Sequence, residues 1–322
     1  MIDRRYKVEG SFDFNYCGAC GLLWMDPMPT DEEARKFYEI YFTHDNSRSP
    51  ERSPEKGMVR PIKDFIRASV LCGYYGYGAA RKGLLFRWLG RILRFTPFIG
   101  AASTYHLGPL LPHFDTVKGS AVIDVGCGDG QYLEMLQAIG CDVLGIEPDP
   151  AACSVLKKKN IPFIEAGMEG ARLPENSANL ITMRHVIEHL VDPLGTVNEC
   201  FRVLKPGGRL VVRTPNSASL SHKRFKSSWY PIDTPRHLYL FSPKSMKLFG
   251  EKSLFGDCAV RTLATTAGCI YDTSITIAEK GNVYSAPIRP QGGRTWFILK
   301  ERLLCALGWP CGEEIEAVFT RK

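Results

Sequence analysis

The 322-residue sequence has no stretch of about 18 uncharged apolar residues, the minimum for a helix that crosses a membrane. The first ten residues, Met1 to Gly10, are charged and lack the apolar core of a secretory signal. We therefore expect no integral membrane segment and no secretory signal in this sequence.

The sequence also lacks a regular cysteine framework. Its eleven cysteines are an odd number without even spacing, and several fall in predicted core strands and helices. Small secreted domains use evenly paired cysteines, whereas reduced thiols are typical of the cytoplasm. We expect free thiols and a cytoplasmic location. Cys17 and Cys20 have the spacing of a zinc knuckle, but a closed structural site needs four ligands and nothing upstream of Cys17 can serve. We therefore expect no metal here.

Charge of one sign is not in great excess. The net charge is +7, and the sequence has no lysine-rich tail and no basic stripe with interleaved aromatics of the kind that binds nucleic acid. A solvated surface is the ordinary explanation for this charge, and attraction to an anionic membrane is the alternative. The apolar fraction of 44% suits a globular core. We expect no nucleic-acid partner.

The chain divides by composition into three parts. Residues 1–47 form a small unit around Cys17 and Cys20, with a helix that Thr30 caps. Residues 48–117 contain a Pro- and Ser-rich linker and then apolar residues at helical spacing, with arginines among them. This helical extension either lies on a membrane surface or covers a substrate cleft, and we favour the cover. Residues 118–322 form the main domain, with an insertion at about 215–241.

From Ser120 onward, strands and helices alternate, which predicts a parallel sheet with crossover helices. The fold class we expect is α/β, a Rossmann-like doubly wound and mostly parallel sheet of seven strands with an amino-terminal helical extension. The predicted strands are 121–125, 142–147, 162–166, 179–183, 208–214, 269–277 and 314–320. The predicted helices are 130–139, 150–159, 193–204, 243–267 and 295–307.

A glycine-rich turn follows the first of these strands. Residues Val122 to Gly130 read Val-Ile-Asp-Val-Gly-Cys-Gly-Asp-Gly and lead into a helix. Glycines let a ligand approach the backbone, and the helix amino terminus favours an anionic group. The second strand ends at Glu147, and an acid at that position can accept both hydroxyls of a ribose. The pattern therefore predicts an adenosine-bearing ligand.

The motif G-x-G-x-G differs from the dinucleotide motif G-x-G-x-x-G, because its third glycine comes one residue earlier. It resembles motif I of the class I S-adenosylmethionine-dependent methyltransferases. Further segments in the family's order are Gly145–Asp149, Leu180–Leu190 and Leu204–Asn216. Trp229–Pro243, with its Pro-Arg-His-Leu motif, and the Cys-x-x-Cys-Gly-Leu segment at Cys17–Leu22 resemble one bacterial branch of that family.

The resemblance implies S-adenosyl-L-methionine as cofactor and assigns its site. The residues expected to bind it are Asp124, Gly126, Cys127, Gly128, Glu147, Met168 and Arg184. It also implies a methyltransferase acting on a small-molecule or glycan-linked acceptor, at oxygen. A non-catalytic S-adenosylmethionine-binding scaffold is the alternative. Peripheral membrane contact stays open, and the sequence says nothing of the oligomeric state.

Three residues are candidates for catalysis. His185 begins the segment His185-Val-Ile-Glu-His189, which also matches the zinc-peptidase motif H-x-x-E-H, but Asp192 and Pro193 end it too soon for that helix. Related O-methyltransferases of quinone synthesis use acids and a histidine here for a divalent metal. His185 stands where those enzymes carry an acid, so we expect none.

Arg236 and His237 lie in the segment that should border the substrate. The arginine either binds an anionic group of the substrate or pins its segment to the core, and the histidine is either a base or a part of the same structural pin. We favour His237 as the general base and give His185 a positioning role.

Overall fold

The computed structural model describes residues 1–4, 10–37, 65–66, 68–70, 72–73, 83–94, 119–138, 140–283 and 292–322. The expected linker and much of the expected helical extension lie outside these residues. The chain divides into two compact units. One is Thr43–Glu165, and the other joins Met1–Phe42 to Ala166–Lys322.

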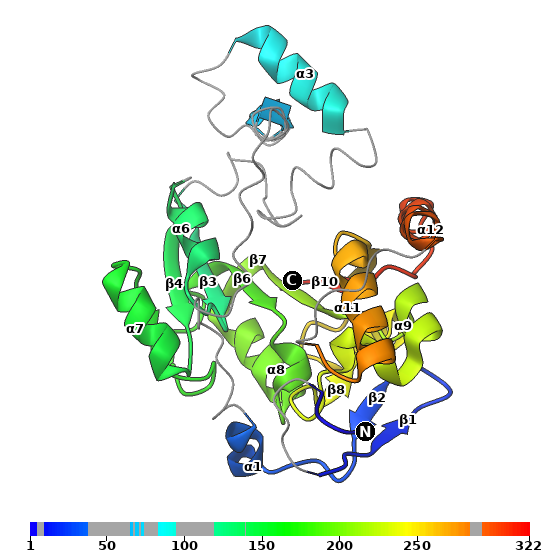
Figure 1. Ribbon diagram of the computed structural model, residues 1–322. Coiled ribbons are helices and arrows are strands. Elements are labelled where there is room, and N and C mark those ends of the chain that lie inside the picture. The colour runs from blue at the N-terminus through cyan, green and yellow to red at the C-terminus, as the bar shows by residue number, and fades with distance from the viewer. Residues whose placement is uncertain are drawn as a thin grey trace. The chain divides into compact units, whose positions relative to one another are not determined.

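Seven strands form the main sheet, in the order β5-β4-β3-β6-β7-β10-β9 (Figure 1). Their bounds are β3 Ala121–Val125, β4 Asp142–Ile146, β5 Phe163–Ile164, β6 Ala178–Arg184, β7 Leu204–Pro215, β9 Ala259–Leu263 and β10 Glu314–Thr320. The pairs β3–β4, β4–β5 and β6–β7 are parallel, whereas β10 pairs antiparallel with both β7 and β9. This confirms the Rossmann-like, mostly parallel sheet of seven strands.

In the unit Thr43–Glu165, strands β3 and β4 run in register, so that Val125 pairs with Ile146 and both strands end at one edge. Helix α6 (Gln131–Ala138) follows β3, and α7 (Pro150–Lys158) follows β4. Asp149 caps α7 by accepting from the Ala151 amide. The register therefore brings the residues after β3 beside Glu147, which follows β4.

In the other unit, helices α8 (Pro193–Val203), α9 (Leu220–Phe225), α10 (Pro243–Lys252), α11 (Ala267–Lys280) and α12 (Arg294–Ala306) accompany the antiparallel part of the sheet. Short 3-10 turns are η2 (Ile187–His189), η3 (Lys226–Ser228) and η4 (Tyr230–Ile232). A charge cluster links the strands, since the buried Arg213 on β7 and the exposed Arg261 on β9 both donate to the buried Glu316 on β10. No helix among the described residues is long and apolar enough to cross a membrane.

A second, smaller sheet of three strands joins the two sequence segments that make up this unit. Strands β1 (Phe14–Tyr16) and β2 (Leu23–Met25) form a hairpin, and β2 pairs with β8 (Tyr239–Leu240). Helix α1 (Asp31–Lys36) follows, with the capping box that the sequence predicted at Thr30 and Glu33. The amino-terminal segment therefore packs beside the segment that carries His237.

Two predictions near the carboxyl terminus are wrong. The helix predicted at 243–267 ends at Lys252, and β9 occupies 259–263. The strand predicted at 269–277 is helix α11. Its β-branched residues suggested a strand, but Ile270, Ser274 and Ile277 are buried at helical spacing. Ser253 and Gly256, which lie in the turn after α10, were the stop signals that the prediction overlooked.

Candidate functional site

The glycine-rich turn after β3 has the backbone that only glycine adopts readily. Gly126, Gly128 and Gly130 all have φ in the left-handed region, at 66°, 56° and 73°. A Cβ on Gly130 would lie 2.5 Å from both Ile161 and Leu156, so this glycine also allows the turn to pack on its own unit. The turn therefore requires glycine for its left-handed backbone and, at Gly130, for its close packing.

Glu147 closes this turn from the end of β4. Its carboxylate accepts from the Gly128 amide at 2.8 Å and from the Asp149 amide at 3.0 Å. These two bonds fix the orientation of the carboxylate. Asp124, near the end of β3, is also buried.

The Cys127 thiol is buried within its own unit. Its side chain lies under Gly145, where an added Cβ would meet the cysteine Sγ at 2.5 Å. Burial, and then the nearby Asp124 and Glu147 carboxylates, hold the pKa of the Cys127 thiol far above its usual value. The thiol therefore stays protonated and is unsuited to nucleophilic work.

The structure divides the predicted cofactor residues between its two units. Asp124, Gly126, Cys127, Gly128 and Glu147 gather in the unit Thr43–Glu165, whereas Met168 and Arg184 belong to the other. Met168 is buried, and Arg184 is the last residue of β6. Nothing in the structure tests their contact with a cofactor, and all seven assignments stay predictions.

The residues predicted for catalysis gather in the other unit, around Glu188. His185, the first residue after β6, has φ of 55°, a strained value for a side chain with a Cβ. Its two ring nitrogens contact two carboxylates, Nδ1 with Glu188 at 3.3 Å and Nε2 with Glu314 at 2.9 Å. The side chain is 48% exposed, and hydrogen bonds to the two carboxylates raise the pKa of His185. His185 is therefore a cation at neutral pH.

His237 has the opposite electrostatic character. It is buried, and its Nδ1 donates to the Pro231 carbonyl at 2.7 Å, which places the lone pair on Nε2. Burial and the neighbouring His189 lower the pKa of His237 to about 4. The Nε2 atom lies 4.0 Å from Glu188 Oε1. His237 is therefore a neutral imidazole that can accept a proton.

Arg236 does not offer its guanidinium to a ligand. It is buried, and it forms a bidentate pair with Asp3 at 3.0 and 3.1 Å and a second pair with Asp233 at 2.7 Å. Of the two roles that the sequence left open, these contacts favour the structural one, in which Arg236 holds its segment to the core. Because the Asp3 carboxylate comes from the amino-terminal segment, that segment helps to hold the loop that carries His237.

Among the described residues, one group of side chains has the geometry to hold a metal ion. Glu188, His189 and His237 each offer one ligand atom, and the three atoms lie within 4.8 Å of one another. His189 Nδ1 donates to the Arg236 carbonyl at 3.0 Å, so both histidines keep Nε2 as the acceptor. Oε2 of Glu188 is buried without a hydrogen-bond partner. These three groups fit a divalent ion, and the expectation of no metal stays a prediction.

Cys17 and Cys20 lie in the turn between β1 and β2. The Cys17 amide donates to the Leu22 carbonyl at 2.9 Å, and the Gly21 amide donates to the Cys17 carbonyl at 2.7 Å. Hydrogen bonds from the Cys20 backbone and side chain lower the pKa of Cys17. No third His, Cys, Asp or Glu ligand joins them within the part of the chain that the structure describes.

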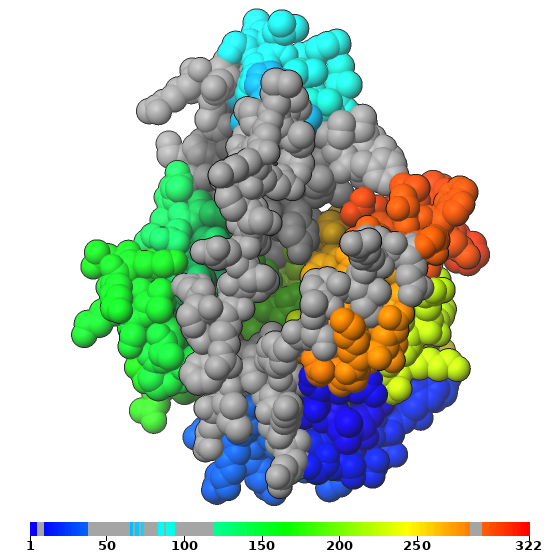
Figure 2. Space-filling model, in the orientation of Figure 1, coloured from blue at the N-terminus to red at the C-terminus, as the bar shows by residue number. Residues whose placement is uncertain are grey.

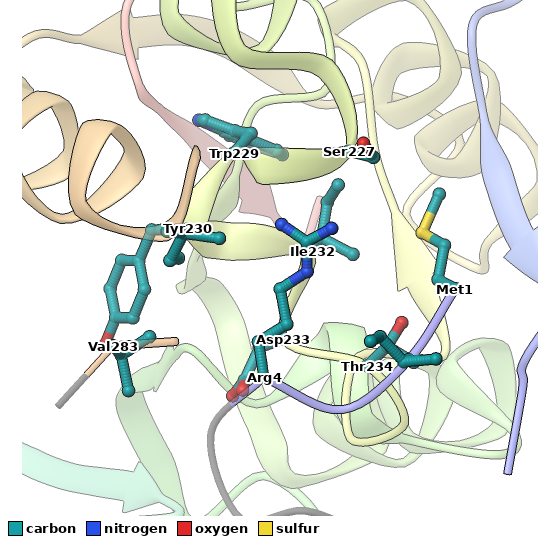
Figure 3. A pocket seen from close by; sticks show the side chains of 11 residues that line it. Met1, Arg4, Ser227, Trp229, Tyr230, Ile232, Asp233, Thr234 and Val283 are labelled. Atoms are coloured by element: carbon teal, nitrogen blue, oxygen red, sulfur yellow. The ribbon is translucent and has the colours of Figure 1, made fainter. Parts of the chain in front are cut away.

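A small pocket lies beside the predicted insertion at 215–241 (Figure 3). Its lining residues are Met1, Ile2, Arg4, Ser227, Trp229, Tyr230, Ile232, Asp233, Thr234, Ile277 and Val283. Arg4 reaches into it and donates to the Ser228 hydroxyl at 3.1 Å. The pocket therefore combines an aromatic and apolar wall with one cation and one carboxylate.

Sequence reasoning missed Glu314 and Asp3, which contact His185 and Arg236. Both pairings are long-range, 129 and 233 residues apart. A signal for Glu314 was present, since Glu314 and Glu316 are two acids in a mostly apolar strand and Glu313 directly precedes it. Acids at buried strand positions indicate cationic partners.

Comparison with known proteins finds similar methyltransferase sequences. Residues 104–253 match a family model described as "Methyltransferase domain". A protein of Mycolicibacterium smegmatis named "Probable S-adenosylmethionine-dependent methyltransferase" is 32% identical over 108 residues, which are 33% of this chain and 42% of that protein. The ubiquinone biosynthesis O-methyltransferase of Idiomarina loihiensis is 26% identical over 198 residues, 56% of this chain and 80% of that protein.

Among solved structures, a Thermotoga maritima protein described as an S-adenosylmethionine-dependent methyltransferase aligns with 73% of this chain and 94% of its own. It has a TM-score of 0.46 and 18% identity. The chain covers about two fifths of the length of the mycobacterial relatives it matches. The family-model match and the sequence relatives support the predicted methyltransferase domain. They do not test the likeness to a branch that carries the amino-terminal cysteine segment.

Proposed function

We propose that this protein transfers a methyl group from S-adenosyl-L-methionine to an oxygen of a small-molecule or glycan- or lipid-linked acceptor. The turn after β3, with its three left-handed glycines and the Glu147 carboxylate fixed beside it, is the observation that carries the proposal. The matched methyltransferase domain and the names of the quinone-synthesis relatives support it.

S-adenosyl-L-methionine supplies a methyl group that its sulfonium already activates, so the protein mainly positions the reactants. Gly126 and Gly128 give the backbone room to approach the ligand, because neither carries a Cβ. Glu147 is the carboxylate that accepts the ribose hydroxyls in this proposal. Asp124 is the second carboxylate at the sheet edge where β3 and β4 end.

His237 serves as the general base in this proposal. An oxygen acceptor must lose its proton, and a neutral imidazole with an available Nε2 is suited to take it. The bond from Nδ1 to the Pro231 carbonyl fixes the tautomer, and the Glu188 carboxylate stabilises the imidazolium that forms. Glu188 thus serves His237 through charge rather than through proton transfer.

His185 and Arg236 act as positioning residues. His185 is a cation between Glu188 and Glu314, so it holds Glu188 in place and is a poor base. Arg236 ties the His237 loop to Asp3 and Asp233. This differs from the anion-binding role that the sequence left open for Arg236.

The acceptor side of the proposal rests on the segment 215–241. Six of its residues line the pocket of Figure 3, and Trp229 and Tyr230 give that pocket an aromatic wall. Aromatic walls with a few polar groups are typical of small-molecule sites. All eleven cysteines, each within the described residues, are free thiols, which supports the cytoplasmic location we propose.

The first experiment is isothermal titration of the full chain with S-adenosyl-L-methionine. Glu147→Ala should weaken binding at least tenfold, because a lost pair of charge-assisted hydrogen bonds costs about 1.4 kcal/mol or more. Asp142→Ala is the matched control, since Asp142 is an exposed acid at the opposite end of the same strand. Equal affinity of Glu147→Ala and the parent would show that the cofactor site lies elsewhere.

A second experiment separates an enzyme from a binding module. Transfer of tritium from labelled S-adenosyl-L-methionine into phenolic or sugar acceptors, or into extracts of the source organism, should depend on His237. A protein that binds the cofactor but transfers no label to any acceptor would favour the non-catalytic alternative.

A further inference from the structure

The positive charge of this protein is concentrated in one part of its sequence. Residues 60–118 contain nine lysines and arginines and two aspartates, a net charge of +7, which equals the net charge of the whole chain. The remaining residues are therefore neutral overall. Helix α3 (Leu84–Arg94) lies in the middle of this basic segment and contains three arginines and no acid.

Helix α3 presents an exposed apolar face. Leu84, Trp88 and Ile92 are spaced by four residues, so they form one stripe, and they are 81%, 60% and 43% exposed. Leu85, beside the stripe, is 79% exposed. Atoms of this helix are cyan in Figure 2. A helix that exposes this much leucine and tryptophan needs a covering surface.

The other face of α3 is fastened within its own unit. A Cβ on Gly90 would fall 1.7 Å from the Ser69 carbonyl oxygen, so only glycine permits this close crossing. Phe86 meets Phe65 edge to face at 5.2 Å, and Arg91 donates to the Gly73 carbonyl at 3.1 Å. The helix is thus fixed by one face, and the apolar stripe is left on the other.

We propose that α3 is a membrane-surface helix that binds bilayers containing anionic lipid. Leu84, Trp88 and Ile92 enter the boundary between headgroups and acyl chains, and the basic residues of 60–118 attract anionic headgroups. A short helix with arginines and an apolar stripe of Leu and Trp is built to lie in such an interface. At 11 residues it is too short to span the bilayer.

The apolar stripe favours a bilayer over nucleic acid. A polyanion would neutralise the arginines but would leave Leu84, Leu85 and Trp88 in water, whereas a bilayer covers both the charge and the apolar surface. This inference does not depend on the proposed methyl transfer, because binding to vesicles is measured without cofactor or acceptor. Of the two roles predicted for the helical extension, the inference favours membrane-surface binding over covering a substrate cleft.

The experiment is flotation of the full chain with vesicles of phosphatidylcholine, alone or with about one third phosphatidylglycerol. The parent should float with anionic vesicles, bind neutral ones far more weakly, and dissociate as salt rises. The double variant Arg87→Gln/Arg94→Gln should bind anionic vesicles more than tenfold more weakly, because each basic residue near the surface is worth about fivefold.

A second double variant, Leu84→Ser/Trp88→Ser, removes the stripe and leaves the charge. It should also lose most vesicle binding. The matched control is Trp296→Ser/Leu303→Ser on α12, which removes a tryptophan and a leucine that are 75% and 59% exposed in the other unit. The control should float like the parent. Melting temperatures within a few degrees of the parent would show that all variants fold.

Three results would overturn the proposal. One is equal flotation of the parent with neutral and anionic vesicles. Another is parent-like flotation of both α3 variants. The third is no vesicle binding by the parent together with tight binding to a single-stranded RNA of mixed sequence, which would assign the basic segment to nucleic acid. Quenching of tryptophan fluorescence by brominated lipid, lost in Trp88→Phe, would support the proposed depth of the helix.

Discussion

The buried carboxyl groups of Glu301 and Glu313 give a stability prediction that can be worked from the structure. Glu301 lies on α12 and Glu313 directly before β10, and both are fully buried. Glu313 accepts from the Trp229 indole at 3.2 Å. Burial and then the charge of Glu313 raise the pKa of Glu301 to about 9. Glu301 is therefore protonated in the folded protein at neutral pH.

The sign of the pH dependence follows from this raised pKa. In the unfolded chain Glu301 has an ordinary pKa of 4.5, so between pH 4.5 and 9 the unfolded state binds fewer protons than the folded state. Stability then falls as pH rises through that window. At pH 7 the cost is about 3 kcal/mol, because each of roughly 2.5 pKa units is worth about 1.4 kcal/mol.

The test is Glu301→Gln, which keeps the shape of the side chain and cannot ionise. Its melting temperature should exceed that of the parent by several degrees at pH 8 and match it near pH 5. Glu251→Gln, an exposed glutamate on α10, is the control and should track the parent at both values. If the parent and Glu301→Gln lose stability in parallel between pH 5 and pH 8, the assignment of a protonated Glu301 is refuted.

Four further outcomes follow from the site. Gly126→Val should block cofactor binding in the titration while the melting temperature stays near that of the parent. His237→Ala should lower turnover by about 10²-fold or more at unchanged cofactor affinity, as expected for loss of a general base. In the parent, turnover should fall only as pH approaches 4, where His237 takes up a proton. A turnover that instead follows a pKa near 6.5 would contradict this assignment. His185→Ala should reduce both turnover and melting temperature, because two buried carboxylates lose their cation, and an unchanged melting temperature would argue against the ion pairs. Chelator-treated protein should keep its activity. Activity that is lost on chelation and returns only with added divalent ion would instead identify Glu188, His189 and His237 as a metal centre. The double variant Cys17→Ser with Cys20→Ser should leave metal content and melting temperature unchanged.

The sheet could be predicted wherever apolar runs were short and bounded by turn residues. Strands Ala121–Val125 and Glu314–Thr320 were predicted to the residue, because Gly119 and Gly126 flank the first and a polar, glycine-rich segment precedes the second. Helix α11 was not, because β-branched residues suit both a strand and a buried helix. Only tertiary packing, which buries Ile270 and Ile277 on one side, decides between them.

The sequence predicted those features of the candidate site that depend on residues near one another in the chain. The glycine-rich turn, Glu147 and the two histidines are read from neighbouring residues. The protonation of His185 was not predictable, because it depends on Glu314, a residue 129 positions away that only the fold brings near. The pinning of Arg236 depends in the same way on Asp3.

The pairing of β2 with β8, and of Asp3 with Arg236, has a consequence for the order of folding during synthesis. Residues 1–37 leave the ribosome well before their partners at 236–240, which follow after about two hundred more residues. Until then, the hairpin of β1 and β2 has an open strand edge, and two-stranded hairpins are marginal alone. The hairpin of β1 and β2 is therefore made long before its sheet is completed, and a chain stalled before residue 236 would expose that edge to chaperones or to other nascent chains.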